Sequence, residues 1–202
     1  MARSSLHQPL LGDAMANDKL PDGLEISGPG MEGLRNAIKK LADQEVLVGI
    51  PEVNADRNAG ETITNAALGY LHEFGAPEQN IPARPFLYPG IRDEKERIAA
   101  GLKKVANAIA DGASAQQVDQ LLAQVGMIAS SSVKKKINSG LEPALAESTL
   151  AARARRGRAG AAQELANRAA GLSPSTALAK PLVDTGALRN SITYVVSNRR
   201  KK

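Results

Sequence analysis

Cysteine and tryptophan are both absent from this chain, and no run of apolar residues is long. Without cysteine, disulfide bonds and thiolate metal sites are excluded, which fits assembly in a reducing compartment. A membrane-spanning helix needs about 20 consecutive apolar residues, and the sequence contains no such run. The N-terminal region also lacks the apolar core of a signal peptide. We therefore expect no membrane partner.

Side chains that carry catalysis are scarce as well. Two histidines and no cysteine leave few parts for a catalytic triad or a thiol nucleophile. No glycine-rich segment ends in Gly-Lys-Ser or Gly-Lys-Thr, so a P-loop is excluded. His72 and Glu73 lack the second histidine of a zinc-protease helix, and Gly75 breaks the helical turn where it would lie. The sequence predicts neither a metal site nor a cofactor.

The few aromatic residues cluster in one segment. Four of the five lie within residues 70–91, namely Tyr70, Phe74, Phe86 and Tyr88. Large rings bury the most apolar area per residue, so the cluster marks a core or an interface. Pro82 and Pro85 flank Arg84 and favour extended backbone. We therefore interpret the segment as a docking surface for a neighbouring subunit rather than as a helix or a central strand.

Arg84 and Phe86 are the centre of this docking hypothesis. A guanidinium held between two prolines loses little backbone entropy when it binds a neighbouring subunit's carboxylate in a bidentate pair. The alternative is that Arg84 satisfies carbonyl groups within its own subunit. Phe86 is expected to fill an apolar pocket, either in its own domain or in the neighbour.

Positive charge is concentrated in three runs, at residues 134–136, 153–158 and 199–202, within a chain of formal net charge +5. Such runs favour a phosphate-bearing or acidic partner. The candidate contacts to DNA or to a neighbouring protein are Arg153, Arg155, Arg156, Arg158, Arg199, Arg200, Lys201 and Lys202. Aromatic residues are not interleaved with these runs, which argues against stacking of single-stranded nucleic acid.

Hydrophobic periodicity predicts an α+β fold, with a small antiparallel sheet packed against two long helices. Apolar and β-branched runs at residues 46–50 and 192–196 predict two strands that pair with each other. Helical periodicity is expected over residues 31–43, 63–74, 91–111 and 115–138. A capping box formed by Ser114 and Gln117 begins the last of these helices.

The chain divides into an arm, one domain and a tail. Residues 1–30 are rich in polar residues, glycine and proline and predict a flexible arm. Residues 31–196 form a single α+β domain, and residues 197–202 a basic tail. Within the domain, residues 140–180 are rich in alanine and arginine. We interpret that stretch as a loop-rich excursion with one helix around residues 161–170.

Asp184, Thr185 and Gly186 match the Asp-Thr-Gly loop of retroviral-type aspartic proteases, in which two aspartates share one proton. Leu188 continues that motif poorly. The alternative is a structural turn, in which Asp184 or Thr185 caps residues 188–190 and Gly186 allows a tight bend.

Four blocks of sequence, taken together, resemble the neck or tail-completion family of tailed bacteriophages, the virion morphogenesis proteins that join head to tail. The blocks are residues 48–51 (VGIP), 72–77 (HEFGAP), 81–87 (IPARPFL) and 180–192 (KPLVDTGALRNSI). The chain departs from the family pattern in its N-terminal arm and in the arginine- and alanine-rich stretch before Lys180.

This resemblance implies a structural virion protein without enzymatic activity, assembled in the host cytoplasm. It implies a homo-oligomeric ring, six-fold rather than twelve-fold, between head-side connector and tail-side proteins. Double-stranded DNA would pass through the ring and contact basic residues without sequence preference. Two alternatives remain open: a basic DNA-binding module and the aspartic protease.

Overall fold

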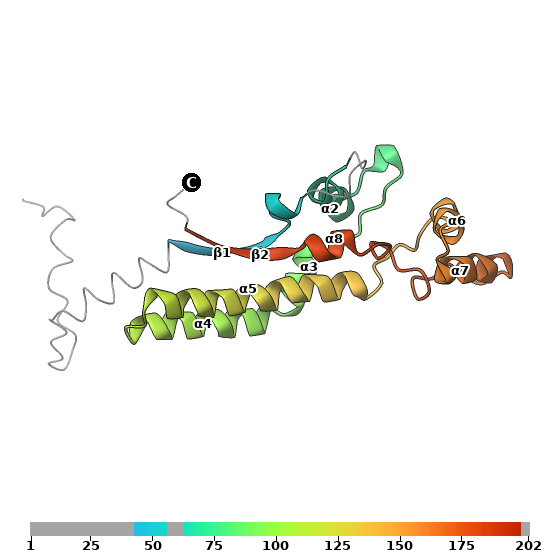
Figure 1. Cartoon of the computed structure of the whole chain (residues 1–202). Coiled ribbons are helices and arrows are strands. Elements are labelled where there is room, and N and C mark those ends of the chain that lie inside the picture. Colours follow the sequence, from blue (N-terminus) through green and yellow to red (C-terminus); the bar gives the residue numbers. More distant parts are fainter. Residues whose placement is uncertain (1–42, 56–62, 199–202) are drawn as a thin grey trace, which may run out of the picture.

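The computed structural model describes residues 43–55 and 63–198 (Figure 1). The predicted arm, most of the helix expected at residues 31–43 and the run at residues 199–202 lie outside the described residues. The elements are β1 (Gln44–Gly49), η1 (Glu52–Asn54), α2 (Asn65–Phe74), η2 (Pro77–Gln79), α3 (Leu87–Asp93), α4 (Lys95–Ala110), α5 (Ala115–Asn138), α6 (Glu147–Arg155), α7 (Ala159–Ala169), α8 (Ala187–Ser191) and β2 (Thr193–Asn198). The α+β class is confirmed.

Helix α5 is the element against which most of the domain packs. It contacts α3, α4, α8 and both strands, and it runs alongside the sheet in Figure 1. The predicted capping box begins it: the Gln117 N–H donates to Ser114 Oγ over 3.3 Å, and the Ser114 N–H donates to Gln117 Oε1 over 2.9 Å. Its 24 residues span about 36 Å at 1.5 Å per residue.

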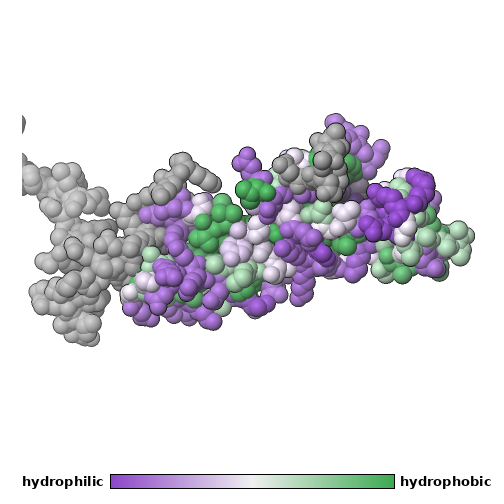
Figure 2. All heavy atoms as spheres, in the orientation of Figure 1, coloured by the Kyte–Doolittle hydropathy of each residue, from purple (hydrophilic) through white to green (hydrophobic). Residues whose placement is uncertain are grey.

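The two predicted strands pair antiparallel, with Val46 opposite Val196 and Leu47 opposite Val195. Alternation along each strand separates two faces. Val46 and Val196 pack towards the cluster formed by α4 and α5. Leu47 and Val195 lie on the opposite face and are 43% and 42% exposed. Figure 2 shows apolar surface over this part of the molecule.

The helix expected at residues 91–111 is in fact two helices. The backbone at Glu94 leaves the helical region, with φ −115° and ψ 20°, and separates α3 from α4. Helix α3 begins at Leu87, so the prediction that the proline-rich segment is non-helical throughout is wrong. Pro89 lies in the first turn of α3, where a missing N–H donor costs little.

A carboxylate from α2 begins helix α3. Glu73 accepts the backbone N–H groups of Phe86 (2.7 Å), Leu87 (2.9 Å) and Tyr88 (3.3 Å). These are orphan donors of a helix N-terminus, which favours a negative charge. Local sequence could not reveal this cap, because Glu73 lies in another helix.

Gly90 allows α3 to lie directly on α5. A Cβ at this position would be 2.7 Å from Val133 Cα, closer than real Cβ atoms approach. The Ser132 hydroxyl donates to the Gly90 carbonyl across the same contact. The hydrophobic core next to this contact is formed by Phe86, Val133, Ile137, Leu141 and Ile192.

Residues 140–180 contain two helices where one was predicted. Helices α6 and α7 pack against each other and form a hairpin beyond the C-terminal end of α5 (Figure 1). Their core is small: Leu145, Leu150, Ala161 and Ala179. Helix α7 corresponds to the helix predicted around residues 161–170, α6 was not predicted, and residues 140–146, 156–158 and 170–180 lie outside both helices. Short alanine-rich faces bury enough surface when two helices meet.

A buried ion pair fixes the loops around this α6–α7 hairpin. Glu164 is 1% exposed, and its Oε1 accepts from the Ser175 N–H (2.8 Å) and from Arg168 Nε (3.0 Å). The Ser175 backbone hydrogen bond, followed by Arg168, lowers the pKa of Glu164 despite its burial. Arg168 also donates from Nη1 to the Leu145 carbonyl over 2.9 Å.

No described helix is long and apolar enough to cross a membrane.

Candidate functional site

Three of the four sequence blocks meet at one place in the structure. Residues 72–77 end α2, residues 81–87 lead into α3, and residues 180–192 pass the α6–α7 hairpin and enter α8. A cavity of about 320 Å³ lies where they meet. Its charged and polar lining includes His72, Arg84, Thr149, Arg153, Asp184 and Thr185. We call this region the junction cavity.

Arg84 donates within its own subunit, as the alternative interpretation expected, and its pairing with a carboxylate of a neighbouring subunit stays a prediction. Its side chain is 6% exposed. Nε donates to the Pro143 carbonyl over 2.8 Å, and Nη2 donates to the Ala144 carbonyl over 3.2 Å. This is the alternative expected from the sequence, in which Arg84 satisfies carbonyl groups of its own subunit. Burial is the largest cause of the lowered pKa of Arg84.

The aromatic residues divide into one core residue and three surface residues. Phe86 is 3% exposed and fills an apolar pocket of its own domain, which confirms one of the two expectations for it. Tyr70, Phe74 and Tyr88 are 65%, 66% and 70% exposed. The rings of Tyr70 and Phe74 lie 4.8 Å apart. Pro82 and Pro85 are exposed as well.

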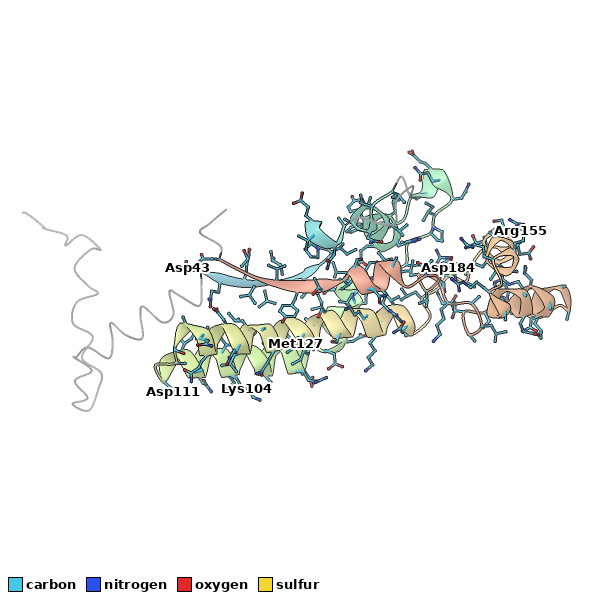
Figure 3. The ribbon with its side chains drawn as sticks, in the orientation of Figure 1. Asp43, Lys104, Asp111, Met127, Arg155 and Asp184 are labelled. Carbon is cyan, nitrogen blue, oxygen red and sulfur yellow. The ribbon has the colours of Figure 1, made fainter. Side chains whose placement is uncertain are left out.

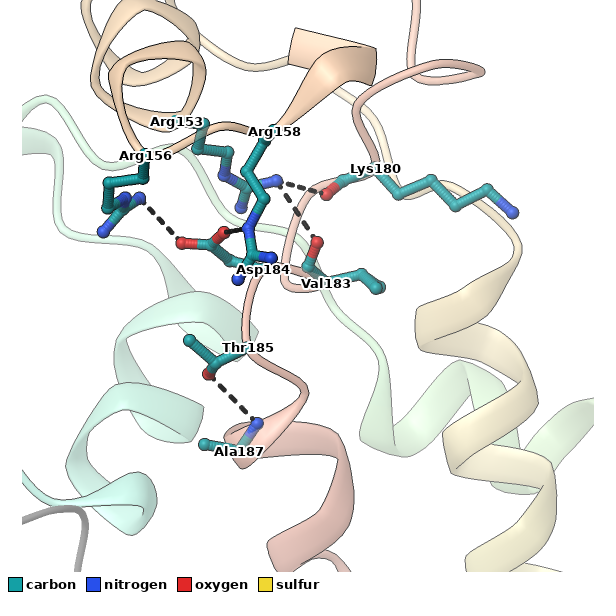
Figure 4. Close-up of polar contacts among 8 residues, drawn as sticks. All are labelled: Arg153, Arg156, Arg158, Lys180, Val183, Asp184, Thr185 and Ala187. Atoms are coloured by element: carbon teal, nitrogen blue, oxygen red, sulfur yellow. Dashed lines mark hydrogen bonds and ion pairs between the residues drawn. The ribbon is translucent and has the colours of Figure 1, made fainter.

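The arginines of residues 153–158 serve several purposes. Arg153 is 8% exposed, and its Nη1 donates to the carbonyls of Lys180 (2.9 Å) and Val183 (3.3 Å) (Figure 4). Its burial disfavours a role in an open contact to DNA, and a contact of Arg153 to a neighbouring protein stays a prediction. Arg155 projects from α6 near the end of the molecule (Figure 3) and is exposed.

Asp184 is the partner of the other two arginines. Its Oδ2 is 2.7 Å from Arg156 Nη2, and its Oδ1 is 3.1 Å from Arg158 Nε (Figure 4). Both guanidinium groups are half exposed, so these ion pairs tie the α6–α7 hairpin to the turn before α8 without burying the charges.

The predicted turn at residues 184–186 is confirmed at Gly186, whose φ of 79° is left-handed. Thr185 Oγ1 accepts the Ala187 N–H over 3.3 Å, whereas Asp184 is not a cap because it binds the two arginines. Leu182 also has a positive φ, of 60°. Bulky residues rarely adopt that conformation, which marks a locally strained backbone.

His72 is the residue whose environment sequence reasoning missed. Its Nδ1 is buried and has no hydrogen-bond partner among the described residues. Burial, and then the positive charge of Arg84, lowers its pKa from 6.5 to about 4. No local sequence pattern predicts this lowered pKa, because Arg84 comes close to His72 only in the folded chain. No cluster of metal-ligating side chains occurs in residues 43–55 and 63–198.

We predict that lowering the pH below about 6.5 decreases the folding stability, because the folded state keeps His72 neutral. Above pH 6.5 the side chain is neutral in both states, so it contributes no pH dependence. As pH falls from about 6.5 towards 4, His72 becomes protonated in the unfolded chain but stays neutral in the folded chain. The free energy of unfolding should therefore decrease over this range, and less so in His72→Gln. Urea unfolding between pH 7 and 5 checks this, and equal slopes in both proteins would contradict it.

We also predict that Gly186→Val destabilises the protein more than Asp184→Asn. Asp184→Asn removes half-exposed ion pairs, which are worth about 0–1 kcal/mol each. Gly186→Val places a β-branched residue at a left-handed φ and should cost roughly 2 kcal/mol or more. Urea unfolding at low and high salt provides the measurement. Salt screens the ion pairs, so it should reduce the difference in the free energy of unfolding between wild type and Asp184→Asn. A larger loss for Asp184→Asn would show that the carboxylate, not the glycine, holds the turn.

Known proteins give no independent guide to this site. Comparisons with protein-family models, curated proteins and solved structures find no match to the chain. The junction cavity, the exposed rings and the resemblance of the four blocks are therefore the observations on which a function can be proposed.

Proposed function

We propose that this protein is a structural virion protein of a tailed phage that assembles into a ring at the head–tail junction. The observation that carries the proposal is the convergence of three of the four blocks on the junction cavity. The fourth block, residues 48–51, belongs to the same unit, because Val48 and Ile50 pack on the Phe86 core. Residues that carry the resemblance are thus parts of one folded unit.

The exposed rings are the proposed subunit interface. Tyr70, Phe74 and Tyr88 lie on α2 and the first turn of α3, and each is more than half exposed. Exposed aromatic residues supply most of the energy of many protein interfaces. Arg84 no longer belongs to this surface, but its bonds to the Pro143 and Ala144 carbonyls fix the segment that presents it.

The geometry disfavours the aspartic protease. Protease aspartates share a proton because two carboxylates lie close together. Asp184 instead lies between two guanidinium groups, at 2.7 Å and 3.1 Å, and not beside a second carboxylate with which it could share a proton. The buried Arg153 likewise weakens the alternative of a basic DNA-binding module.

The ring is tested by measuring the mass of the purified protein with light scattering after size exclusion. We expect a closed oligomer, six-fold rather than twelve-fold. Phe74→Ser with Tyr70→Ser should dissociate it, because the proposed interface loses both neighbouring rings. Leu178→Ser is the control, since Leu178 is 46% exposed on the hairpin side of the molecule. A monomer at all concentrations, or equal assembly in the Tyr70/Phe74 variant, would contradict the proposal.

DNA in the channel is a second part of the same proposal. The candidate contacts with the most accessible positive charge are Arg155, which is exposed, and residues 199–202. Arg156 and Arg158 also stay candidates, although both are paired with Asp184. We expect them to face the lumen and to hold phosphates without sequence preference. Duplexes of unrelated sequence should bind equally, with affinity falling steeply with salt.

Removing residues 199–202 and neutralising Arg155 should make the salt dependence shallower by about one unit of slope per lost phosphate contact. The control, matched in charge, neutralises five exposed cationic residues of α3 and α4, namely Arg92, Lys95, Arg97, Lys103 and Lys104. Equal binding by the two variants, or binding that salt does not weaken, would exclude the lumenal assignment.

A further inference from the structure

The junction cavity has a polar floor and apolar walls. Arg84 and Arg153 both line it and are each more than nine-tenths buried. The walls include Leu68 from α2, Leu145 from the segment before α6, and Leu188 from α8. The cavity thus lies between the domain and the α6–α7 hairpin, and each side contributes one buried guanidinium.

Neither guanidinium uses all of its donors. A guanidinium offers five N–H groups across three nitrogens. Arg84 donates from Nε and Nη2, which leaves Nη1, and Arg153 donates only from Nη1. Within the described residues, the remaining nitrogens make no hydrogen bond. His72 Nδ1, on the same cavity, is also without a partner.

Positive charge at the cavity is only partly neutralised. The charged lining consists of two guanidinium groups and the carboxylate of Asp184. That carboxylate already binds Arg156 and Arg158 from the far side. Arg84 lowers the pKa of His72, and Arg156 and Arg158 help burial to lower that of Arg153, against the opposing effect of Asp184. Glu142 opposes the lowered pKa of Arg84 as Asp184 opposes that of Arg153, whereas the charge of Arg153 adds to burial in lowering the pKa of Arg84. The repulsion between these buried positive groups indicates a site in which further negative charge is favourable.

We propose that the junction cavity binds the carboxylate of an aspartate or glutamate side chain presented by a partner protein. The two oxygens of a carboxylate fit the fork of a guanidinium, and its negative charge complements the two buried guanidinium groups of the lining. The apolar walls receive the methylene groups of the acidic side chain. This inference does not depend on the ring or on DNA.

The imidazole of His72 serves as the reporter, because it lines the cavity and its signals are assigned with His72→Gln. The full chain is titrated with acetyl-Gly-Glu-Gly-amide, and the imidazole ¹⁵N and ¹³C shifts are followed by NMR. We expect a saturable shift, and binding at least about tenfold weaker for acetyl-Gly-Gln-Gly-amide, which lacks the charge. Inorganic phosphate is titrated in parallel.

The test variant is Thr149→Glu, because Thr149 is exposed, lines the cavity and lies in the first turn of α6. Its carboxylate should occupy the site and abolish the response to the glutamate peptide. The matched control is Ser148→Glu, which adds the same charge to an exposed neighbour outside the lining. Both variants leave the buried arginines in place, so loss of folding does not confuse the result.

Three outcomes would overturn the proposal. They are no saturable shift of His72, equal loss of binding in Thr149→Glu and Ser148→Glu, and tighter binding of inorganic phosphate than of the glutamate peptide. A response confined to the glutamate peptide and removed only by Thr149→Glu would establish the cavity as a carboxylate site.

Discussion

Two buried guanidinium groups hold together the irregular parts of this protein. Arg84 donates to the carbonyls of Pro143 and Ala144, and Arg153 donates to those of Lys180 and Val183. Buried backbone carbonyls outside helices and sheets need such donors, because leaving them unpaired costs free energy comparable to a lost hydrogen bond. The position of the α6–α7 hairpin, the turn before α8 and the junction cavity all depend on these bonds.

The same chemistry explains why this region differs from the rest of the domain. Around α5, the fold is built on apolar packing and a close glycine contact, which leave little polar surface inside. The junction is instead polar, with Asp184 shared by two arginines and His72 held neutral beside Arg84. The junction cavity, of about 320 Å³, lies in this polar region and brings charged side chains from three sequence blocks together.

The candidate site was only partly predictable. The clustering of proline, rings and Arg84 predicted a docking segment. Tyr70, Phe74 and Tyr88 lie on the surface, as such a segment requires, whereas Arg84 is buried. Sequence gives the type of a side chain and its neighbours along the chain. It does not give the direction in which an extended segment faces, since that depends on what packs behind it.

The sequence by itself determined the features that short-range physics controls. Alternating β-branched residues specified the two strands, the Ser114 capping box specified the start of α5, and glycine at position 186 specified the left-handed turn. Tertiary structure alone decided the start of α3, which Glu73 caps from another helix, and the pairing of Asp184 with arginines more than 20 residues away. Hydrogen bonds and charges between distant segments exist only after the chain has folded, so no local pattern encodes them.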